Sequence, residues 1–213
     1  MSVSMFHTDK YGWTRLHWAA TRLSRSQILT ALQDLDVNVF TGPENWEEGE
    51  TALAVICSND NAIRFVDEED PYEYLWTQER DEKRDEERVI ATIDLLLEHG
   101  ADINLAKYGW TPMHQAVKYC KLNIVRHLLK RGANPDGAPT YTDERTPLHV
   151  ALDHFSSLEM IKTLVEAGAN PNIHQGGATS LADSLQEAID IAEEVSPHRQ
   201  YLIETVLPYV QSL

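Results

Sequence analysis

A short tag of the form T-x-x-[HA] recurs along the chain at nearly regular intervals. Four copies begin at Thr14, Thr51, Thr111 and Thr146, and a fifth, degenerate copy begins at Thr179. The steps between them are 37, 60, 35 and 33 residues, so three of the four lie near a 33-residue period. Such a period is typical of stacked arrays whose units cannot bury their apolar faces alone. The repeat therefore predicts a solenoid, and it directs the search for function towards binding.

The residues within one period predict a pair of short helices. Thr111 followed by Pro112 predicts a helix start, because the hydroxyl caps free amides and proline fits the first helical position. Apolar residues then recur at helical spacing in two stripes, within residues 113–117 and 124–129. Gly132 stands where the second helix must end in a left-handed residue. Each unit is therefore predicted to hold two antiparallel helices and an extended loop, and the chain about five such units.

The T-P-L-H tag, joined to a following L-L-x-x-G-A-[DN] segment, resembles the ankyrin repeat. Residues 111–144 and 145–177 carry both parts, and residues 93–104 supply the second part for the unit that begins at Thr51. The resemblance covers roughly residues 10–178. It implies an all-α ankyrin-repeat solenoid of stacked helix-turn-helix units with extended loops.

We expect a single ankyrin-repeat domain over residues 1–213. Its units are predicted over residues 10–45, 47–106 with an insertion over 62–88, 107–142 and 143–175, followed by a C-terminal cap over 176–213. Both ends depart from the pattern, since Asp34 stands where the first unit would have its glycine and Ala182 replaces the tag histidine in the last. The first helix of the last unit is predicted to run through Glu194 and the second to begin at Pro197. We interpret this unit as a cap without a binding role.

Net charge is the second informative feature of the chain. The formal net charge is −16, and the isoelectric point is near 4.8. Nucleic acids and anionic membranes are then poor partners, because both require a positive face on the protein. A protein partner with a basic surface would instead be attracted. The alternative is that the acidity serves only solubility.

The sequence also favours a cytoplasmic protein. No stretch approaches the roughly 18 apolar residues of a membrane span, and residues 1–10 lack the basic start and apolar core of a signal peptide. Cys57 and Cys120 fall in predicted first helices at non-equivalent positions, so we expect buried, reduced thiols and no disulfide framework.

The 60-residue step between the second and third tags contains an acidic insertion. Residues 67–88 carry 11 acidic and 4 basic side chains, and three aromatic residues, Tyr72, Tyr74 and Trp76, lie among them. From residue 77 onwards the segment is predicted to be a charged helix that continues through residues 89–99. One hypothesis is a docking element in which aromatic side chains anchor a partner and the charge steers its approach. The alternative is a solvated helical extension without a partner.

A second candidate surface is the concave face implied by the resemblance, which the loops and first helices would line. The pentapeptide K-Y-G-W-T occurs at residues 10–14 and again at 107–111, where it enters the first and third units. Aromatic and charged residues at these loop and first-helix positions are our candidates for partner binding. They are Tyr11, Trp13, Arg22, Trp46, Tyr108, Trp110, Lys118, Tyr119, Tyr141, Asp153 and His154. The alternative for the tryptophans is that they pack sideways onto the next loop and stabilise the stack.

We expect no catalytic residue, no metal site and no cofactor. By resemblance, the tag histidines His17, His114 and His149 link adjacent loops by hydrogen bonds. His149 and His154 are five residues apart, which is a poor helical spacing for ligands of one metal ion. The chain contains no G-x-S-x-G, P-loop or dinucleotide-binding glycine pattern.

The sequence therefore predicts a non-enzymatic protein-binding module that is monomeric before it binds. The leading hypothesis is an intracellular inhibitor or neutraliser of the immunity type. A compact acidic chain without an effector domain would act by occupying a partner, such as a basic toxin or enzyme. One alternative is a scaffold or adaptor that bridges two proteins through the concave face and the insertion. Another is a secreted ankyrin effector that acts in a host cell.

Overall fold

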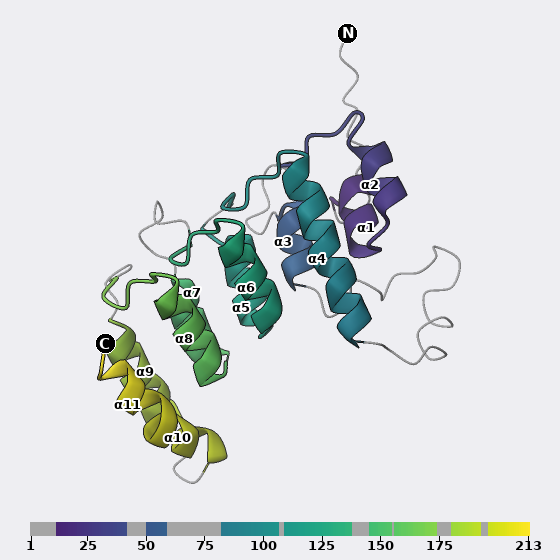
Figure 1. Ribbon diagram of the computed structural model, residues 1–213. Helices are drawn as coiled ribbons and strands as arrows, with labels where there is room; N and C mark the ends of the chain where they lie inside the picture. The colour runs from purple at the N-terminus through teal and green to yellow at the C-terminus, as the bar shows by residue number, and fades with distance from the viewer. Residues whose placement is uncertain are drawn as a thin grey trace.

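The structure is a row of paired helices that follows the chain from its N-terminal to its C-terminal end (Figure 1). The computed structural model describes residues 12–41, 50–58, 82–106, 109–137, 145–154, 156–173, 180–192 and 196–213, with side chains from residue 86 onwards in the helix over 82–98. The helices are α1 (Arg15–Thr21), α2 (Arg25–Ala31), α3 (Ala52–Ser58), α4 (Glu82–Glu98), α5 (Pro112–Lys118), α6 (Leu122–Lys130), α7 (Pro147–Asp153), α8 (Leu158–Glu166), α9 (Leu181–Ile191), α10 (Pro197–Tyr201), the π-helical turn η2 (Leu202–Val206) and α11 (Leu207–Val210). Within the described ranges, β structure is limited to isolated bridge residues, which include the pair Phe40 and Thr51 and also Trp110. The predicted all-α class is confirmed.

The hydrophobic core runs along the whole row. The first helices α1, α3, α5, α7 and α9 contact one another in succession, and each also packs against a later helix of its own unit. Leu16, Leu53, Met113 and Leu148, one from each of the first four, are at most 1% exposed. Because each pair is too small to bury its own apolar faces, the core exists only through stacking, as the repeat predicted.

The tag residues start the first helices by capping them. In α1, the hydroxyl of Thr14 accepts a hydrogen bond from the Leu16 N–H, and the Thr14 N–H donates to Nδ1 of His17 at 3.3 Å. The Thr111 N–H donates in the same way to Nδ1 of His114 at 3.1 Å, at the start of α5. In α1 and α5 the tag is therefore a capping box in which histidine occupies the place usually held by glutamate or glutamine, whereas the side chain of Thr146 caps no backbone N–H at the start of α7.

The first helix of the last unit begins one residue later than the tag at Thr179 predicts. Ser180, not Thr179, caps α9: its hydroxyl accepts from the Asp183 N–H, and the Asp183 carboxylate accepts from the Ser180 N–H at 3.0 Å. Adjacent hydroxyl residues can both act as caps, and Asp183 selects Ser180 because it lies three residues further on. Helix α9 also ends at Ile191, before the predicted Glu194. The predicted restart at Pro197 is confirmed by α10.

The two cysteines occupy different environments, which corrects the expectation that both are buried in helices. Cys57 lies in α3, and burial raises the pKa of its thiol. Cys120 is exposed and lies in the turn between α5 and α6 with a φ of 54°. A left-handed residue is needed there to reverse the chain between antiparallel helices, so the helix stops before Cys120.

A ladder of asparagine and aspartate side chains joins the extended loops. In the third unit, Oδ1 of Asn134 accepts from the Asp136 N–H at 3.1 Å, which shapes the local turn. Three further bonds, all of 2.8 Å, connect neighbouring units. In these bonds Oδ1 of Asn38, Asn104 and Asp136 accepts from the backbone N–H of Asp102, Asn134 and Asn170 respectively. The loops are thus held together by side chain-to-backbone bonds over four units.

Asp136 is the weakest member of this ladder at neutral pH. Burial raises the pKa of its carboxyl group, although the hydrogen bond from the Asn170 N–H lowers it. Folding therefore disfavours the ionised carboxylate, and this cost is present above the folded pKa and absent below the ordinary value of 3.8. We expect Asp136→Asn, which keeps the acceptor without the charge, to raise Tm by about 1–3 °C at neutral pH. Thermal unfolding should show this gain vanish below about pH 4, whereas Asp136→Ala should lower Tm.

Candidate protein-binding site

The first-helix face is the surface formed by α1, α3, α5 and α7 with the residues that enter and leave them. Tag histidines form its base and connect the units. Nε2 of His17 donates to the carbonyl oxygen of Glu50 at 3.1 Å, and Nε2 of His114 donates to that of Arg145 at 2.9 Å. Each bond ties one tag to the residue that precedes the next tag. The predicted loop-linking role of these two histidines is confirmed.

Burial sets the charge of His114. The side chain is 2% exposed, and this burial lowers its pKa to about 4, while the hydrogen bond to the Arg145 carbonyl opposes the shift. The ring is neutral at physiological pH, with Nδ1 accepting from Thr111 and Nε2 donating to Arg145. The base of the first-helix face at the third unit is therefore uncharged and fixed by hydrogen bonds at both ring nitrogens.

Trp13 and Trp110, the two candidate tryptophans among the described residues, are half-buried and pack on residues of their own units. The ring centroid of Trp13 lies 4.9 Å from that of Trp18 and 6.1 Å from that of His17. The ring centroid of Trp110 lies 5.5 Å from that of His114, and Trp110 also packs against the hydrophobic core. Each of these rings thus packs on the tag histidine of its own unit, whereas the alternative interpretation placed them against the next loop.

Two cations of the first-helix face lie over aromatic rings. The guanidinium carbon of Arg22 is 5.9 Å from the ring centroid of Trp18. Nζ of Lys118 is 5.4 Å from the centroid of Trp110 and 5.7 Å from that of Tyr119. These distances fall within the range of cation–π attraction. Tyr119 remains 40% exposed, so the third unit offers a partner both aromatic area and a positive charge.

Polar side chains extend the first-helix face on either side of the third unit. The Gln115 amide donates to the Glu50 carboxylate, which joins α5 to the residue before α3. Arg145 forms an ion pair with Asp153, and both side chains are substantially exposed. His154, the C-cap of α7, is exposed as well. The structure therefore brings Lys118, Tyr119, Asp153 and His154 onto the ends of neighbouring first helices.

Seven predicted binding residues lie outside the described residues. They are Tyr11, Trp46, Tyr72, Tyr74, Trp76, Tyr108 and Tyr141. The predicted charged helix of the insertion is described from Glu82, where α4 begins, and it continues to Glu98. The part of the prediction that concerns residues 82–98 is confirmed.

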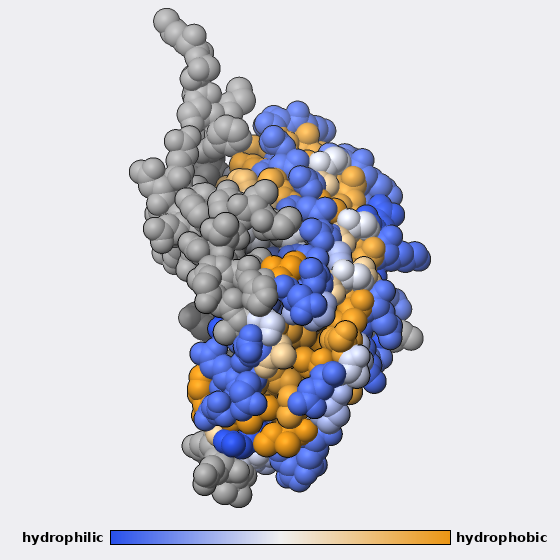
Figure 2. Space-filling view, turned by 90° about the vertical axis from the view of Figure 1, so that its left-hand side faces the viewer, coloured by the Kyte–Doolittle hydropathy of each residue, from blue (hydrophilic) through white to orange (hydrophobic). Residues whose placement is uncertain are grey.

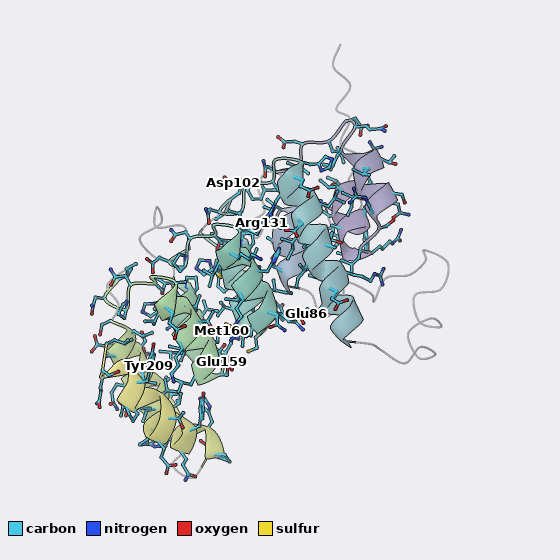
Figure 3. The ribbon with its side chains drawn as sticks, viewed as in Figure 1. Glu86, Asp102, Arg131, Glu159, Met160 and Tyr209 are labelled. Carbon is cyan, nitrogen blue, oxygen red and sulfur yellow. The ribbon has the colours of Figure 1, made fainter. Side chains whose placement is uncertain are left out.

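The opposite side of the row is formed by the second helices and carries ion pairs between units. Asp94 on α4 accepts from Nε2 of His127 at 2.8 Å and lies 3.4 Å from Nε of Arg131. Arg126 on α6 pairs with Glu159 on α8. Figure 3 shows Arg131 at the upper end of α6 and Glu159 near the lower end of the neighbouring helix α8. Helix α6 is thus a basic helix held between acidic groups of its neighbours.

The C-terminal unit presents a surface of mixed polarity. Figure 2 shows hydrophobic patches interspersed with hydrophilic ones on the side of the molecule that includes this unit. Ile191, Ile203 and Leu213 are its exposed large apolar residues, with Ile191 at 77%. Single exposed apolar side chains are ordinary on protein surfaces, so they do not alter the interpretation of this unit as a cap.

Sequence reasoning missed two features of this arrangement. The loop ladder has a visible signal, a [DN]-x-[DN] pattern that ends each period at residues 36–38, 102–104, 134–136 and 170–172. Trp18 was missed because it lies inside a helix, at a position that resembles core. Its contact with Arg22, one turn later, follows the i, i+4 spacing of helical neighbours.

Comparison with known proteins agrees with this geometry. The family model described as ankyrin repeats, in three copies, matches residues 89–175. The chain carries ankyrin repeats. It is 48% identical over 56 residues to an ankyrin repeat protein of fowlpox virus (strain NVSL), a match that covers 25% of this chain and 11% of the relative.

Two animal proteins show the same kind of similarity. One is the ankyrin repeat, SAM and basic leucine zipper domain-containing protein 1 of Notamacropus eugenii, 36% identical over 107 residues, or 46% of this chain and 22% of that protein. The other is Rabankyrin-5 of Homo sapiens, 35% identical over 110 residues, or 46% of this chain and 9% of that protein. The chain therefore spans a minor part of each relative, and the similarity concerns the repeats.

Ankyrin repeats bind proteins, and they are generally non-enzymatic modules. The repeats over residues 89–175 therefore indicate a protein–protein interaction module. None of the helices in the described ranges combines the length and apolarity needed to cross a membrane. Within the same ranges, His, Cys, Asp and Glu side chains form no group of three or more with the geometry of a metal site.

Proposed function

We propose that this ankyrin-repeat chain is a cytoplasmic inhibitor that acts by occupying one partner protein, and that it is monomeric before it binds. The observation that carries the proposal is the cluster of Lys118, Trp110 and Tyr119 at helix α5, which a capping box of Thr111 and His114 starts. An exposed aromatic side chain beside a fixed charge is typical of the residues that dominate protein interfaces. No separate effector domain is needed for this mode of action.

The partner that we propose carries a basic surface. The chain has 34 acidic and 18 basic residues, and residues 67–88 concentrate the excess. An acidic field accelerates the approach of a basic protein, and its contribution falls steeply with salt. A toxin or a basic enzyme neutralised by an immunity-type protein fits this description.

A scaffold that bridges two proteins is the second candidate, because two chemically different surfaces are available. The first-helix face is aromatic and locally basic at the third unit, whereas residues 67–88 are acidic and contain three aromatics. The two candidates differ in stoichiometry. An inhibitor forms a 1:1 complex that abolishes an activity, whereas a scaffold holds two partners at once.

The test is affinity capture from host lysate followed by reconstitution with the purified partner. Three baits are compared: the full chain, a variant with Asp67, Glu68, Glu69, Asp70 and Glu73 changed to Asn or Gln, and Tyr119→Ala. Light scattering then gives the stoichiometry of the complex, and the activity of the partner is assayed with and without the chain. A single 1:1 complex that silences the partner supports an inhibitor. A ternary complex with both partners active would replace it with a scaffold.

A further inference from the structure

The third unit has the opposite charge to the chain as a whole. Residues 107–142 contain six of the 18 Lys and Arg residues and a single acidic residue, Asp136. Two of these basic side chains form ion pairs with neighbouring units: Arg131 with Asp94, and Arg126 with Glu159. The charges of Arg126 and Arg131 are therefore paired with acidic residues of α8 and α4.

Lys118 has different surroundings, although it belongs to the same unit. It is the last residue of α5, on the first-helix face, and none of the carboxylates in the described parts of the chain forms an ion pair with it. Its ammonium group lies near two aromatic rings, 5.4 Å from the centroid of Trp110 and 5.7 Å from that of Tyr119. Trp110 is itself fixed by contact with His114 and the core.

This setting prepares Lys118 to receive an anion. The rings restrict the ammonium group through cation–π attraction but accept no full hydrogen bond, so its N–H donors are available to a partner. Part of the lysine is already buried, which strengthens attraction to a carboxylate by lowering the local dielectric constant. At physiological salt, charges further away than about 8 Å are largely screened. The local positive charge therefore decides short-range contacts despite the net charge of −16.

We propose that Lys118 anchors a carboxylate side chain of the partner protein, with Trp110 and Tyr119 as the apolar walls of the contact. The inference deepens the proposed function and rests on it for the existence of a partner. It adds that a partner attracted by the net negative charge of the chain also presents an aspartate or glutamate, which contacts the ammonium group beside the two rings. Charge-assisted hydrogen bonds from the ammonium group hold it there.

The site can be tested without the partner. The probe is a short fluorescein-labelled peptide in which glutamate alternates with alanine, and the matched probe has glutamine in place of glutamate. Fluorescence anisotropy is measured with the full chain, Lys118→Gln, Lys118→Arg and Lys130→Gln. Lys130 is the control, because it is exposed on α6 of the same unit and its loss changes the net charge equally.

We expect the glutamate peptide to bind more tightly than the glutamine peptide, and Lys118→Gln to weaken it about tenfold. Lys118→Arg should retain most of the affinity, and Lys130→Gln should change it less than about twofold. Equal affinity for the two peptides overturns the proposal. So does an equal loss in Lys118→Gln and Lys130→Gln, because that result indicates diffuse attraction. Peptide binding without any captured partner would retain the site and reject the proposed inhibitor.

Discussion

Gly137→Ala should be more destabilising than the same substitution at Gly100, Gly132 or Gly168. Gly137 has a φ of 78°, and a Cβ atom added there would overlap Cε1 of His114 and lie 2.9 Å from its Nε2. The ring cannot move aside easily, because it is buried and bonded to Thr111 and Arg145. We expect a loss of about 3–4 kcal/mol in unfolding free energy, from left-handed strain and overpacking together. Urea denaturation monitored by circular dichroism measures it.

Gly132→Ala separates these two contributions. Gly132 has a similar φ of 93°, but a Cβ atom there meets nothing within 4 Å. This variant should therefore lose only about 1–2 kcal/mol, the cost of the left-handed backbone. Similar losses in the two variants would show that the ring of His114 yields without cost, which would contradict its assigned role as a fixed link.

Acid should destabilise the protein through His114. The ordinary pKa of 6.5 applies when the chain is unfolded, and burial lowers it to about 4 in the folded state. Below pH 6.5 the unfolded chain therefore binds a proton that the folded chain excludes. Through His114, the free energy of unfolding decreases as the pH falls towards 4. Well below that value, the contribution of His114 stays constant. The shift corresponds to a contribution of about 3 kcal/mol. Protonation would also place a hydrogen atom on Nδ1, which could then no longer accept the hydrogen bond from the Thr111 N–H.

Comparing pH profiles isolates this contribution from that of the many carboxylates. Unfolding free energies of the unmodified chain, His114→Gln and His154→Gln are measured by urea titration between neutral pH and about pH 4. His114→Gln should be less stable at neutral pH and lose less stability on acidification. His154→Gln, at an exposed position, should follow the unmodified chain. Parallel profiles for all three proteins would assign the acid sensitivity to other groups.

The features that could be predicted from the sequence are those determined by local chemistry. A hydroxyl followed by proline starts a helix, so the beginnings of α5 and α7 were placed correctly. A glycine after the second apolar stripe ends a helix, and Gly132 has the positive φ that this helix end requires. Period and apolar spacing then gave the stacked pairs, because such pairs have no other way to bury their faces.

The features that could not be predicted depend on contacts between units or on backbone conformations without a residue signal. Cys120 adopts a left-handed conformation that its side chain does not favour, because the turn between α5 and α6 imposes it. The position of Lys118 between two rings depends on how the loop before α5 folds back on that helix. A sequence pattern shows that Trp110 and Tyr119 are present, but not that they share one cation.

The bond from Asp102 to Asn38 joins residues that are 64 positions apart in the chain. Asn38 also donates to the carbonyl oxygen of Gly100, so the first unit is fastened directly to the end of the second. The stack is therefore continuous across the long intervening segment without relying on its length. Doubling a flexible connection adds only about 0.6 kcal/mol of closure entropy. We therefore expect the stability of the solenoid to depend little on the number of residues between Ser58 and Glu82.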